Sequence, residues 1–267
     1  MFEARILQAA VLKKIVEALR DLVDETSLEC GPDGISLQAM DSSHVCLISL
    51  DLSSTGFETY SLPRPFSMGV KMANLSKILK CANNDDSVTL RADEEGDVLS
   101  LAFEAPGGGR ASEFSLRLIE IESESLGLPD MTFGATVKMP SAEFLRVVKD
   151  LSSIGDTVEI CVPSRELVRF LTTGDIGTAS VSVPRRWNPA DPGESVDIEC
   201  PSPTKLTFGT RYLVSFAKAA PLSEGVSIKL CDEMPAVVEY EVYGVGVLRY
   251  FLAPKVDDFE DDVVEEG

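Results

Sequence analysis

A pattern of one amphipathic helix followed by short strands occurs twice in this chain of 267 residues. The helix and strand predicted over residues 6–30 recur over residues 137–161 at an offset of about 132. The aligned pairs include Leu12 with Phe144, Val16 with Val148, Leu19 with Leu151 and, at an offset of 138 later in each half, Lys80 with Lys218. Insertions in loops produce such small changes of offset, so the repeat predicts a duplicated domain. A hydrophobic content of 44% allows each copy to bury a core.

Between the helices, apolar and polar residues alternate with the period of two that is typical of half-buried strands. The clearest runs are residues 35–40, 45–50, 98–103 and 237–242, with turn residues clustered at 31–34, 83–86, 94–97 and 107–109. This predicts an α+β fold with two similar domains, each having two helices packed on antiparallel sheets. The predicted parts are a first domain at 1–117, a connector at 118–134, a second domain at 135–256 and an acidic tail at 257–267.

Four amphipathic stretches place Lys and Arg opposite an apolar stripe, although the chain has a formal net charge of −20. At about 3.6 residues per helical turn, the stripes are Val11-Ile15-Ala18-Leu19-Leu22, Leu75-Ile78-Leu79-Ala82, Phe144-Val147-Val148-Leu151 and Leu213-Phe216-Ala217-Ala220. The cations beside them are Lys13, Lys14, Arg20, Lys77, Lys80, Arg146, Lys149, Arg211 and Lys218. Nine of the 24 cations but only four of the 44 anions lie on these stretches. Such concentrated positive charge predicts a polyanionic partner.

The backbone of duplex DNA is the polyanion that this pattern favours. Lys and Arg on outer helix faces bind phosphates by releasing counterions, and they do not read bases. Phe144 and Phe216 belong to the apolar stripes, so we expect no aromatic residue among the cations on the outer helix faces, which disfavours stacking on single strands. A pI near 4.4 argues against binding over the whole surface, because like charges repel. The contact with nucleic acid is therefore expected to be local and non-specific.

The sequence offers little catalytic chemistry around its one histidine. His44 follows Asp41, Ser42 and Ser43, but neighbouring residues of an extended segment point to alternate faces and cannot form a relay. We interpret His44 as a surface or strand-end residue. A hydrolase that uses Ser42 or Ser43 with His44 stays open as an alternative, and the preferred prediction is a protein that is not an enzyme and needs no cofactor.

Signals for phosphate loops, metals and membranes are also missing from the sequence. The glycines at 107–109 precede Arg110 and not the Gly-Lys-Ser/Thr of a phosphate loop, so a hairpin tip is predicted there. The six cysteines are widely spread, which favours reduced thiols in the cytosol or nucleus over a zinc site. No run of 18 apolar residues occurs, and the N-terminus does not resemble a signal peptide. No membrane partner is expected.

Five segments carry a resemblance to a known family. They are MDSSHV at 40–45, SKILKCA at 76–82, LGLP at 126–129, DLSSIGD at 150–156 and FLAPK at 251–255. In this order and spacing they resemble the eukaryotic DNA sliding clamps, the proliferating cell nuclear antigen family, over residues 1–256. The resemblance implies a head-to-tail homotrimer that closes into a ring, with the helices lining a hole for double-stranded DNA. It also implies a nuclear processivity factor that tethers DNA polymerases and other replication and repair proteins and is loaded by a separate ATPase.

The resemblance also assigns three sets of site residues. The DNA-binding set is Lys13, Lys14, Arg20, Arg64, Lys77, Lys80, Arg146, Lys149, Arg211 and Lys218, and the family treats the stretch at 61–80 as DNA-binding. The pocket for a short apolar and aromatic peptide motif of clients is Met40, His44, Val45, Leu47, Leu126, Leu128, Pro129, Pro235, Phe251, Leu252, Ala253 and Pro254. The subunit interface joins strands near 110–118 and 175–183 and includes Arg110, Phe114, Leu116, Asp175, Gly177 and Val181.

Three departures from the family pattern are visible. Ser61-Leu62-Pro63-Arg64 replaces the usual Arg-Cys-Asp-Arg, and the usual ubiquitin-acceptor lysine has no counterpart near Ser164-Arg165. The segment 184–203, which holds the only tryptophan, Trp187, has no assigned role. Two other functions stay open: a subunit of a heterotrimeric checkpoint clamp, which shares the fold, and a binding scaffold that does not contact DNA.

Overall fold

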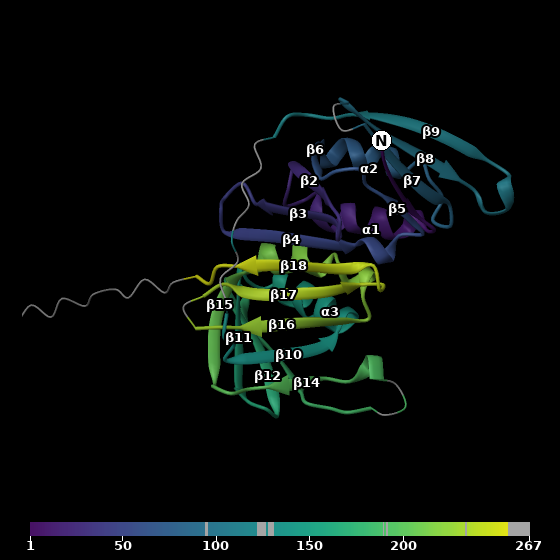
Figure 1. The fold of residues 1–267 in the computed structure, drawn as a ribbon. Coiled ribbons are helices and arrows are strands. Elements are labelled where there is room, and N and C mark those ends of the chain that lie inside the picture. The colour runs from purple at the N-terminus through teal and green to yellow at the C-terminus, as the bar shows by residue number, and fades with distance from the viewer. Residues whose placement is uncertain are drawn as a thin grey trace, which may run out of the picture.

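The computed structural model describes residues 1–93, 96–121, 127, 131–188, 190, 192–232 and 234–255 (Figure 1). The first half contains β1 (Phe2–Ile6), α1 (Ala9–Leu19), β2 (Glu25–Gly31), β3 (Gly34–Met40), β4 (Cys46–Ser53), β5 (Thr59–Ser61), β6 (Phe66–Lys71), α2 (Met72–Leu79), β7 (Ser87–Ala92), β8 (Val98–Glu104) and β9 (Ala111–Arg117). The second half contains β10 (Ala135–Pro140), α3 (Ser141–Ser152), β11 (Thr157–Ser164), β12 (Leu167–Gly174), β13 (Gly177–Pro184), β14 (Asp197–Glu199), β15 (Thr204–Gly209), α4 (Thr210–Ala217), β16 (Gly225–Leu230), β17 (Ala236–Val242) and β18 (Gly246–Leu252). Short 3-10 turns lie at Ser54–Gly56, Pro106–Gly108, Pro192–Glu194 and Ala220–Leu222.

The two halves have the same strand order, which confirms the predicted duplication. In the first half β5-β1-β7-β8-β9 form one sheet, and β14-β10-β16-β17-β18 repeat that order in the second half. Likewise β4-β3-β2-β6 in the first half correspond to β13-β12-β11-β15 in the second. Within the described residues, all neighbouring strands pair in the antiparallel direction. The α+β prediction is confirmed, with two helices in each half over antiparallel sheets.

One pair of strands joins the halves. β18 pairs with β4 along its whole length, from Gly246 opposite Leu52 to Leu252 opposite Cys46, so that the two sheets merge into one of nine strands. The side chains on the inner face of this pair are buried, including Ile48, Leu50 and Tyr250. We call the β18–β4 pair the intrachain junction.

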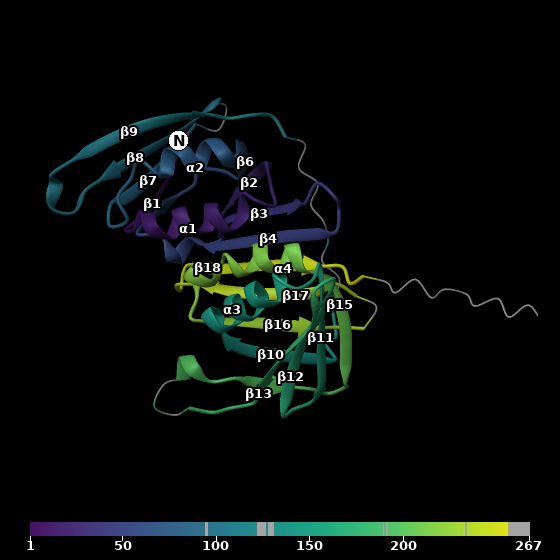
Figure 2. The same cartoon turned by 180° about the vertical axis from the view of Figure 1, so that it is seen from behind.

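All four predicted helices are present and bury most of the predicted stripes; Leu22, Ile78 and Ala220 are half-buried, and Leu22, Ala82 and Ala220 lie beyond the helix ends. Val11, Ile15, Leu75, Val148 and Phe216 all have side chains buried in the core. Figures 1 and 2 show that the helices lie together on one side of the nine-stranded sheet, which leaves its other face open. Each helix therefore buries its apolar stripe against the strands and turns its opposite face away from them.

Two strands at the far ends of the molecule have one unpaired edge. β9 ends the five-stranded sheet, and β13 ends the four-stranded sheet. Side chains along both strands alternate between exposed and half-buried over most of their length. We call β9 and β13 the open edges. An unpaired edge presents backbone N–H and C=O groups that another strand can pair with.

Candidate nucleic-acid interface and partner surfaces

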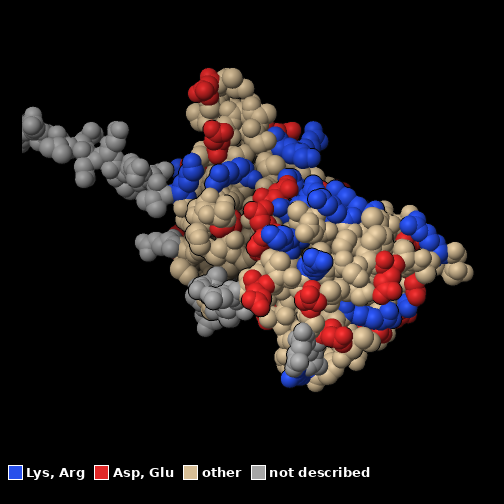
Figure 3. All heavy atoms as spheres, turned by 90° about the horizontal axis from the view of Figure 1, so that it is seen from above, with Lys and Arg blue, Asp and Glu red and all other residues tan. Residues whose placement is uncertain are grey.

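The nine helix cations fall into two groups by exposure. Lys77, Lys80, Arg146, Lys149, Arg211 and Lys218 are exposed, whereas Lys13, Lys14 and Arg20 are half-buried. Figure 3 shows that charge of both signs is gathered locally on the surface, with groups of Lys and Arg beside groups of Asp and Glu. The cations therefore lie away from the buried apolar stripes, as predicted, but the exposure of their side chains to solvent differs between the two groups.

Helix α1 holds its cations against its own chain. The Lys13 Nζ donates to the carbonyl of Ala82 and to Oδ1 of Asn84, both at 3.0 Å. The Lys14 Nζ donates to the carbonyl of Pro221 at 3.1 Å and lies 4.9 Å from the ring centre of Tyr243. These contacts orient the two ammonium groups and leave them less free to follow a moving phosphate.

Three further cations are held by groups of this chain. Arg20 pairs with Glu17 at 2.8 Å, and Lys218 of α4 pairs with Asp21, which follows α1. Arg211 of α4 donates to the Tyr212 hydroxyl at 2.8 Å. The Asp21–Lys218 pair crosses from one half of the chain to the other and links the ends of α1 and α4.

Helices α2 and α3 carry the least constrained cations. Within the described residues, Lys77, Lys80 and Lys149 make no side-chain hydrogen bond or ion pair. Arg146 reaches Asp150 only at 3.8 Å, and the two side chains are 83% and 66% exposed. A pair that exposed contributes little. Arg64 lies in the connection between β5 and β6 and not on a helix.

The carboxylate of Asp41 organises the turn between β3 and β4. Its carboxylate accepts the backbone N–H groups of Ser43, Val45 and Cys46 and the hydroxyl of Tyr212. Burial alone would raise the pKa of Asp41, but these hydrogen bonds hold it below its ordinary value. The exposed His44 has a positive φ of 55° in the same turn. The carboxylate that would orient His44 is thus engaged elsewhere.

The predicted client pocket lies at one end of the intrachain junction. Met40, Leu47 and Phe251 are opposite one another on β3, β4 and β18, and all three are half-buried on the open face of the sheet. The backbone N–H of Ala253 donates to the carbonyl of Val45 at 3.1 Å. These contacts bring segments that are far apart in the sequence into one apolar row.

The remaining predicted pocket residues differ in their access to solvent. Pro235 and Pro254 are half-buried and Ala253 is exposed, but Leu252 is only 1% exposed because it faces the core. Leu126, Leu128 and Pro129 lie outside the described residues. The connector is fixed at its start, where Ile119 bridges Gly69, and a Cβ at Gly69 would lie 2.0 Å from the Ile119 carbonyl oxygen. A glycine is therefore required there for this close approach.

The predicted interface residues lie on or beside the open edges. On β9, Phe114 is half-buried with its ring 5.4 Å from that of Phe103, and Leu116 is buried. Arg110 and Asp175 are exposed in the turns that lead into β9 and β13. On β13, Gly177 is exposed and Val181 is half-buried.

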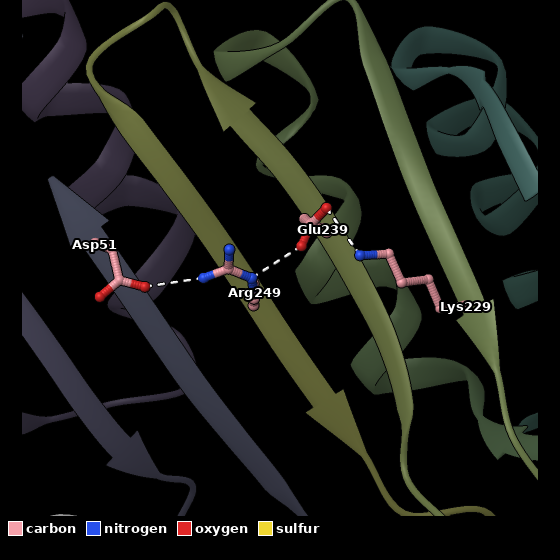
Figure 4. Close-up of polar contacts among 4 residues, drawn as sticks. All are labelled: Asp51, Lys229, Glu239 and Arg249. Atoms are coloured by element: carbon pink, nitrogen blue, oxygen red, sulfur yellow. Dashed lines mark hydrogen bonds and ion pairs between the residues drawn. The ribbon is translucent and has the colours of Figure 1, made fainter. Parts of the chain in front are cut away.

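A row of ion pairs that the sequence did not predict crosses the intrachain junction. Arg249 pairs with Asp51 at 2.9 Å and with Glu239 at 2.8 Å, and Glu239 also accepts from Lys229 at 3.0 Å (Figure 4). Burial alone would raise the pKa of Glu239, but the hydrogen bonds from Lys229 and Arg249 lower it. Only the alternation within each strand hinted at these positions, because their partners are set by tertiary pairing.

Among the described residues, no group of His, Cys, Asp and Glu has the arrangement of a metal site. No helix within the described ranges is long and apolar enough to cross a membrane.

Family comparison covers almost the whole chain. The family model of the proliferating cell nuclear antigen N-terminal domain matches residues 1–125, and the family model of its C-terminal domain matches residues 127–255. The two matches meet between β9 and β10, where the strand order starts to repeat. The chain therefore belongs to the proliferating cell nuclear antigen family and is a DNA sliding clamp of the kind that serves replication and repair.

Proposed function

We propose that this clamp is a homotrimeric processivity factor that encircles double-stranded DNA and tethers DNA polymerases and other clients. The observation that carries the proposal is that the two open edges are equivalent, by the internal repeat, to the two strands of the intrachain junction. By their place in the repeat, the open edges β9 and β13 correspond to β18 and β4, which already pair within the chain. A second copy can therefore repeat the same junction head to tail, and a rotation of one third closes three copies into a ring.

The intrachain junction predicts the register of the contact between subunits. Through the aligned strands, Tyr250 corresponds to Phe114, and Ile48 corresponds to Ala179. Since Tyr250 lies opposite Ile48, Phe114 of one copy is expected opposite Ala179 of the next. Val181 and Gly177 then face Ser112 and Leu116. The predicted interface residues Arg110 and Asp175 would lie at the ends of this ladder.

The helix cations support DNA passage through such a ring. Phosphates exchange rapidly among Lys and Arg that make no fixed contact, which allows sliding without sequence preference. Helices α2 and α3 carry these freer cations, and α1 and α4 carry the tied ones. We therefore propose that all ten predicted cations face DNA, with Lys77, Lys80, Arg146 and Lys149 contributing most.

Client capture is proposed for the apolar row of Met40, Leu47 and Phe251. A short helical turn with apolar anchors fits such a row when the connector covers one side. Tethering raises the effective concentration of a polymerase at the primer, so modest affinity suffices. The proposal includes loading by a separate ATPase and action on nuclear DNA, and it assigns no catalytic step to the clamp itself.

A subunit of a heterotrimeric checkpoint clamp is the second candidate. The same open edges favour it, since β9 and β13 can each pair with a different chain. The oligomeric state of the purified protein distinguishes the two: the homotrimer predicts self-association alone. A chain that stays monomeric until two other proteins are added would support the checkpoint clamp.

Retention on DNA tests the proposed ring. The clamp is loaded on nicked circular DNA, the DNA is cut once, and the bound protein is measured before and after. A ring stays on the circle and slides off the linear form, whereas equal retention would contradict the proposal. In parallel, Lys77→Glu with Lys80→Glu is expected to impair loading or sliding and to leave the trimer intact. Loss of the trimer in that variant would give these lysines a structural role.

A further inference from the structure

The segment between β13 and β14 forms a short hairpin that is fixed to helix α3. Arg186 and Val196 exchange both backbone hydrogen bonds, at 3.0 and 2.8 Å. The guanidinium of Arg186 donates to both carboxylate oxygens of Glu143 on α3. This hairpin contains Trp187, whose role the clamp function leaves unexplained. Its anchoring means that Trp187 is presented from a defined position.

Strand alternation sets the side to which Trp187 points. Arg186 turns inward with the buried Val196, so its neighbours Arg185 and Trp187 point to the opposite side. The Arg185 Nε contacts Oδ1 of Asp197 at 3.2 Å, which confirms that this side is the open face of the sheet. Trp187 is 75% exposed there. A single exposed apolar residue is not a contact surface by itself, but Trp is enriched at interfaces because its large ring joins an apolar body to a polar N–H group.

Beside this face runs an open groove of about 880 Å³ across the second half of the nine-stranded sheet. Its floor is formed by β10, β16 and β17, one wall by Ser195 and Asp197, and its far end by Tyr243 and Gly244. Tyr243 is also 54% exposed. The Glu239–Lys229 pair of Figure 4 lies on the floor. Tyr243 thus flanks the far end of the groove, and the hairpin that carries Trp187 borders its wall, where the backbone N–H of Asn188 donates to the Ser195 hydroxyl at 3.0 Å.

The groove is acidic after its internal pairs are counted. Asp197 pairs with Arg185, and Glu239 pairs with Lys229. Among the described residues, the other charged groups lining it are Glu199, Glu224 and Glu241 against the single Lys138, and the three carboxylates are exposed. The hydroxyl of Ser227 on the floor has no hydrogen-bond partner within the described part of the chain. A guanidinium or ammonium can donate to the oxygens of the three exposed carboxylates.

We propose that this groove binds an extended, Lys- and Arg-rich segment of a partner protein, with Trp187 stacking on one of its cations. Exposed carboxylates attract the charges, and the face of the Trp ring attracts guanidinium groups. The groove spans three gaps between strands, which is roughly 14 Å at about 4.8 Å each, so an extended peptide crosses it with about four residues. The same acidic lining repels DNA, which separates this surface from the helix face.

The test uses the clamp without DNA at physiological salt, with an acetylated Arg-Gly-Arg-Gly-Arg-Gly peptide as the probe. Because Trp187 is the only tryptophan of the chain, its fluorescence reports on the groove directly. Saturable binding with a change in Trp187 emission is expected. Glu199→Gln with Glu241→Gln is expected to weaken the peptide Kd about fivefold. Calorimetry on Trp187→Phe should show weaker binding with an unchanged circular dichroism spectrum.

The control variant is Asp85→Asn with Glu120→Gln, which removes the same charge from exposed positions on the other half. Its Kd is expected to stay within about twofold of the parent clamp, because long-range attraction is screened at this salt. Equal weakening in both variants would show that the peptide follows net charge alone and would overturn the proposal. An unchanged Trp187 emission would overturn it as well. The proposal would also be overturned if a duplex oligonucleotide changed the Trp187 emission and the peptide did not.

Discussion

The intrachain junction and the open edges are the same structural element in two states, one sealed and one unpaired. β18 and β4 meet over seven residue pairs, from Gly246–Leu52 to Leu252–Cys46. Their equivalents β9 and β13 end their sheets without a partner among the described strands. Tyr250 and Ile48 are completely buried, whereas Phe114 and Ala179 are half-buried. In the proposed ring, a second copy would cover the apolar surface that Phe114 and Ala179 leave exposed.

Charge distinguishes the two places further. The sealed junction carries the row of ion pairs of Asp51, Arg249, Glu239 and Lys229 on its open face. At the open edge, Glu113 takes the place of Arg249 and bonds to Ser100 within its own sheet at 2.6 Å. A contact between copies would therefore depend on backbone pairing and apolar packing. We infer that such a contact is weaker than the intrachain junction, which agrees with the proposal that the ring opens for loading.

The largest expected effect is the loss of the ring in Phe114→Asp. A carboxylate placed at the centre of an apolar contact has to be desolvated, and association is expected to fall by about 100-fold or more. Sedimentation should then show a monomer with an unchanged circular dichroism spectrum. Phe114→Tyr is the matched control, since Tyr stands at the equivalent position 250, and it should keep the trimer. A trimer that survives Phe114→Asp would place the contact elsewhere.

The next effect compares the equivalent aromatic residues within one subunit. Tyr250 is completely buried, and its ring is 4.3 Å from that of Phe216. Tyr250→Ala is expected to lower the free energy of unfolding by about 3–5 kcal/mol. Phe114→Ala should cost much less in the monomeric subunit, because half of its contacts are still to be made by a neighbour.

Urea unfolding measures both effects, provided that the protein is monomeric, so that association does not contribute. Tyr250→Ala is therefore measured in the Phe114→Asp background, and Phe114→Ala is measured at a concentration low enough to give the monomer. Similar losses at the two positions would mean that the open edge is already packed like the junction. That result would weaken the equivalence on which the proposed ring depends.

A smaller effect is expected in the row of ion pairs of the junction, and it depends on pH. Glu239→Gln should lower the free energy of unfolding by about 1–2 kcal/mol at neutral pH, because two charge-assisted hydrogen bonds are lost. The folded pKa of Glu239 lies below its ordinary value. Its stabilisation is therefore complete above the unfolded pKa of about 4.3 and is lost as pH falls through the folded pKa.

The difference between the parent and Glu239→Gln should accordingly shrink on acidification, which unfolding curves at pH 7 and below pH 4 will check. Glu241→Gln, on the same strand and the same face but exposed, is the control and should change stability by less than about 0.5 kcal/mol. A pH-independent difference at position 239 would contradict the role of its carboxylate.

The sequence predicted the repeat, the four helices and their basic faces because these depend on local periodicity. Val11 and Ile15, or Phe144 and Val148, recur at helical spacing whatever the rest of the chain does. The junction depends on pairing between residues that are far apart, such as Asp51 and Arg249, which are separated by 198 positions. Nothing local marks their meeting, so this part of the fold could not be predicted.

The same limit applies to the candidate DNA surface. Lys14 and Lys80 are the same residue type on similar helices, and pattern analysis gave them equal weight. The fold distinguishes them, because Lys14 meets the hydroxyl of Tyr243, which is 229 positions away, and Lys80 has no such contact within the described residues. Whether a cation is free depends on tertiary neighbours that periodicity does not reveal.

The smallest expected effect tests this inequality with one aligned pair of lysines. Lys218 is held by Asp21 across the intrachain junction, whereas its equivalent Lys80 would face Ser153, the counterpart of Asp21, across the junction between copies. Lys80→Ala should therefore weaken DNA retention about threefold and lower the salt slope by about one, and Lys218→Ala should change both less. Asp21→Ser should release Lys218 and raise retention slightly, with the trimer unchanged by sedimentation. Equal losses for the two lysines, together with no gain from Asp21→Ser, would mean that an internal ion pair does not limit contact with phosphate. The two kinds of junction would then present the same surface to DNA, and the difference between them would concern assembly alone.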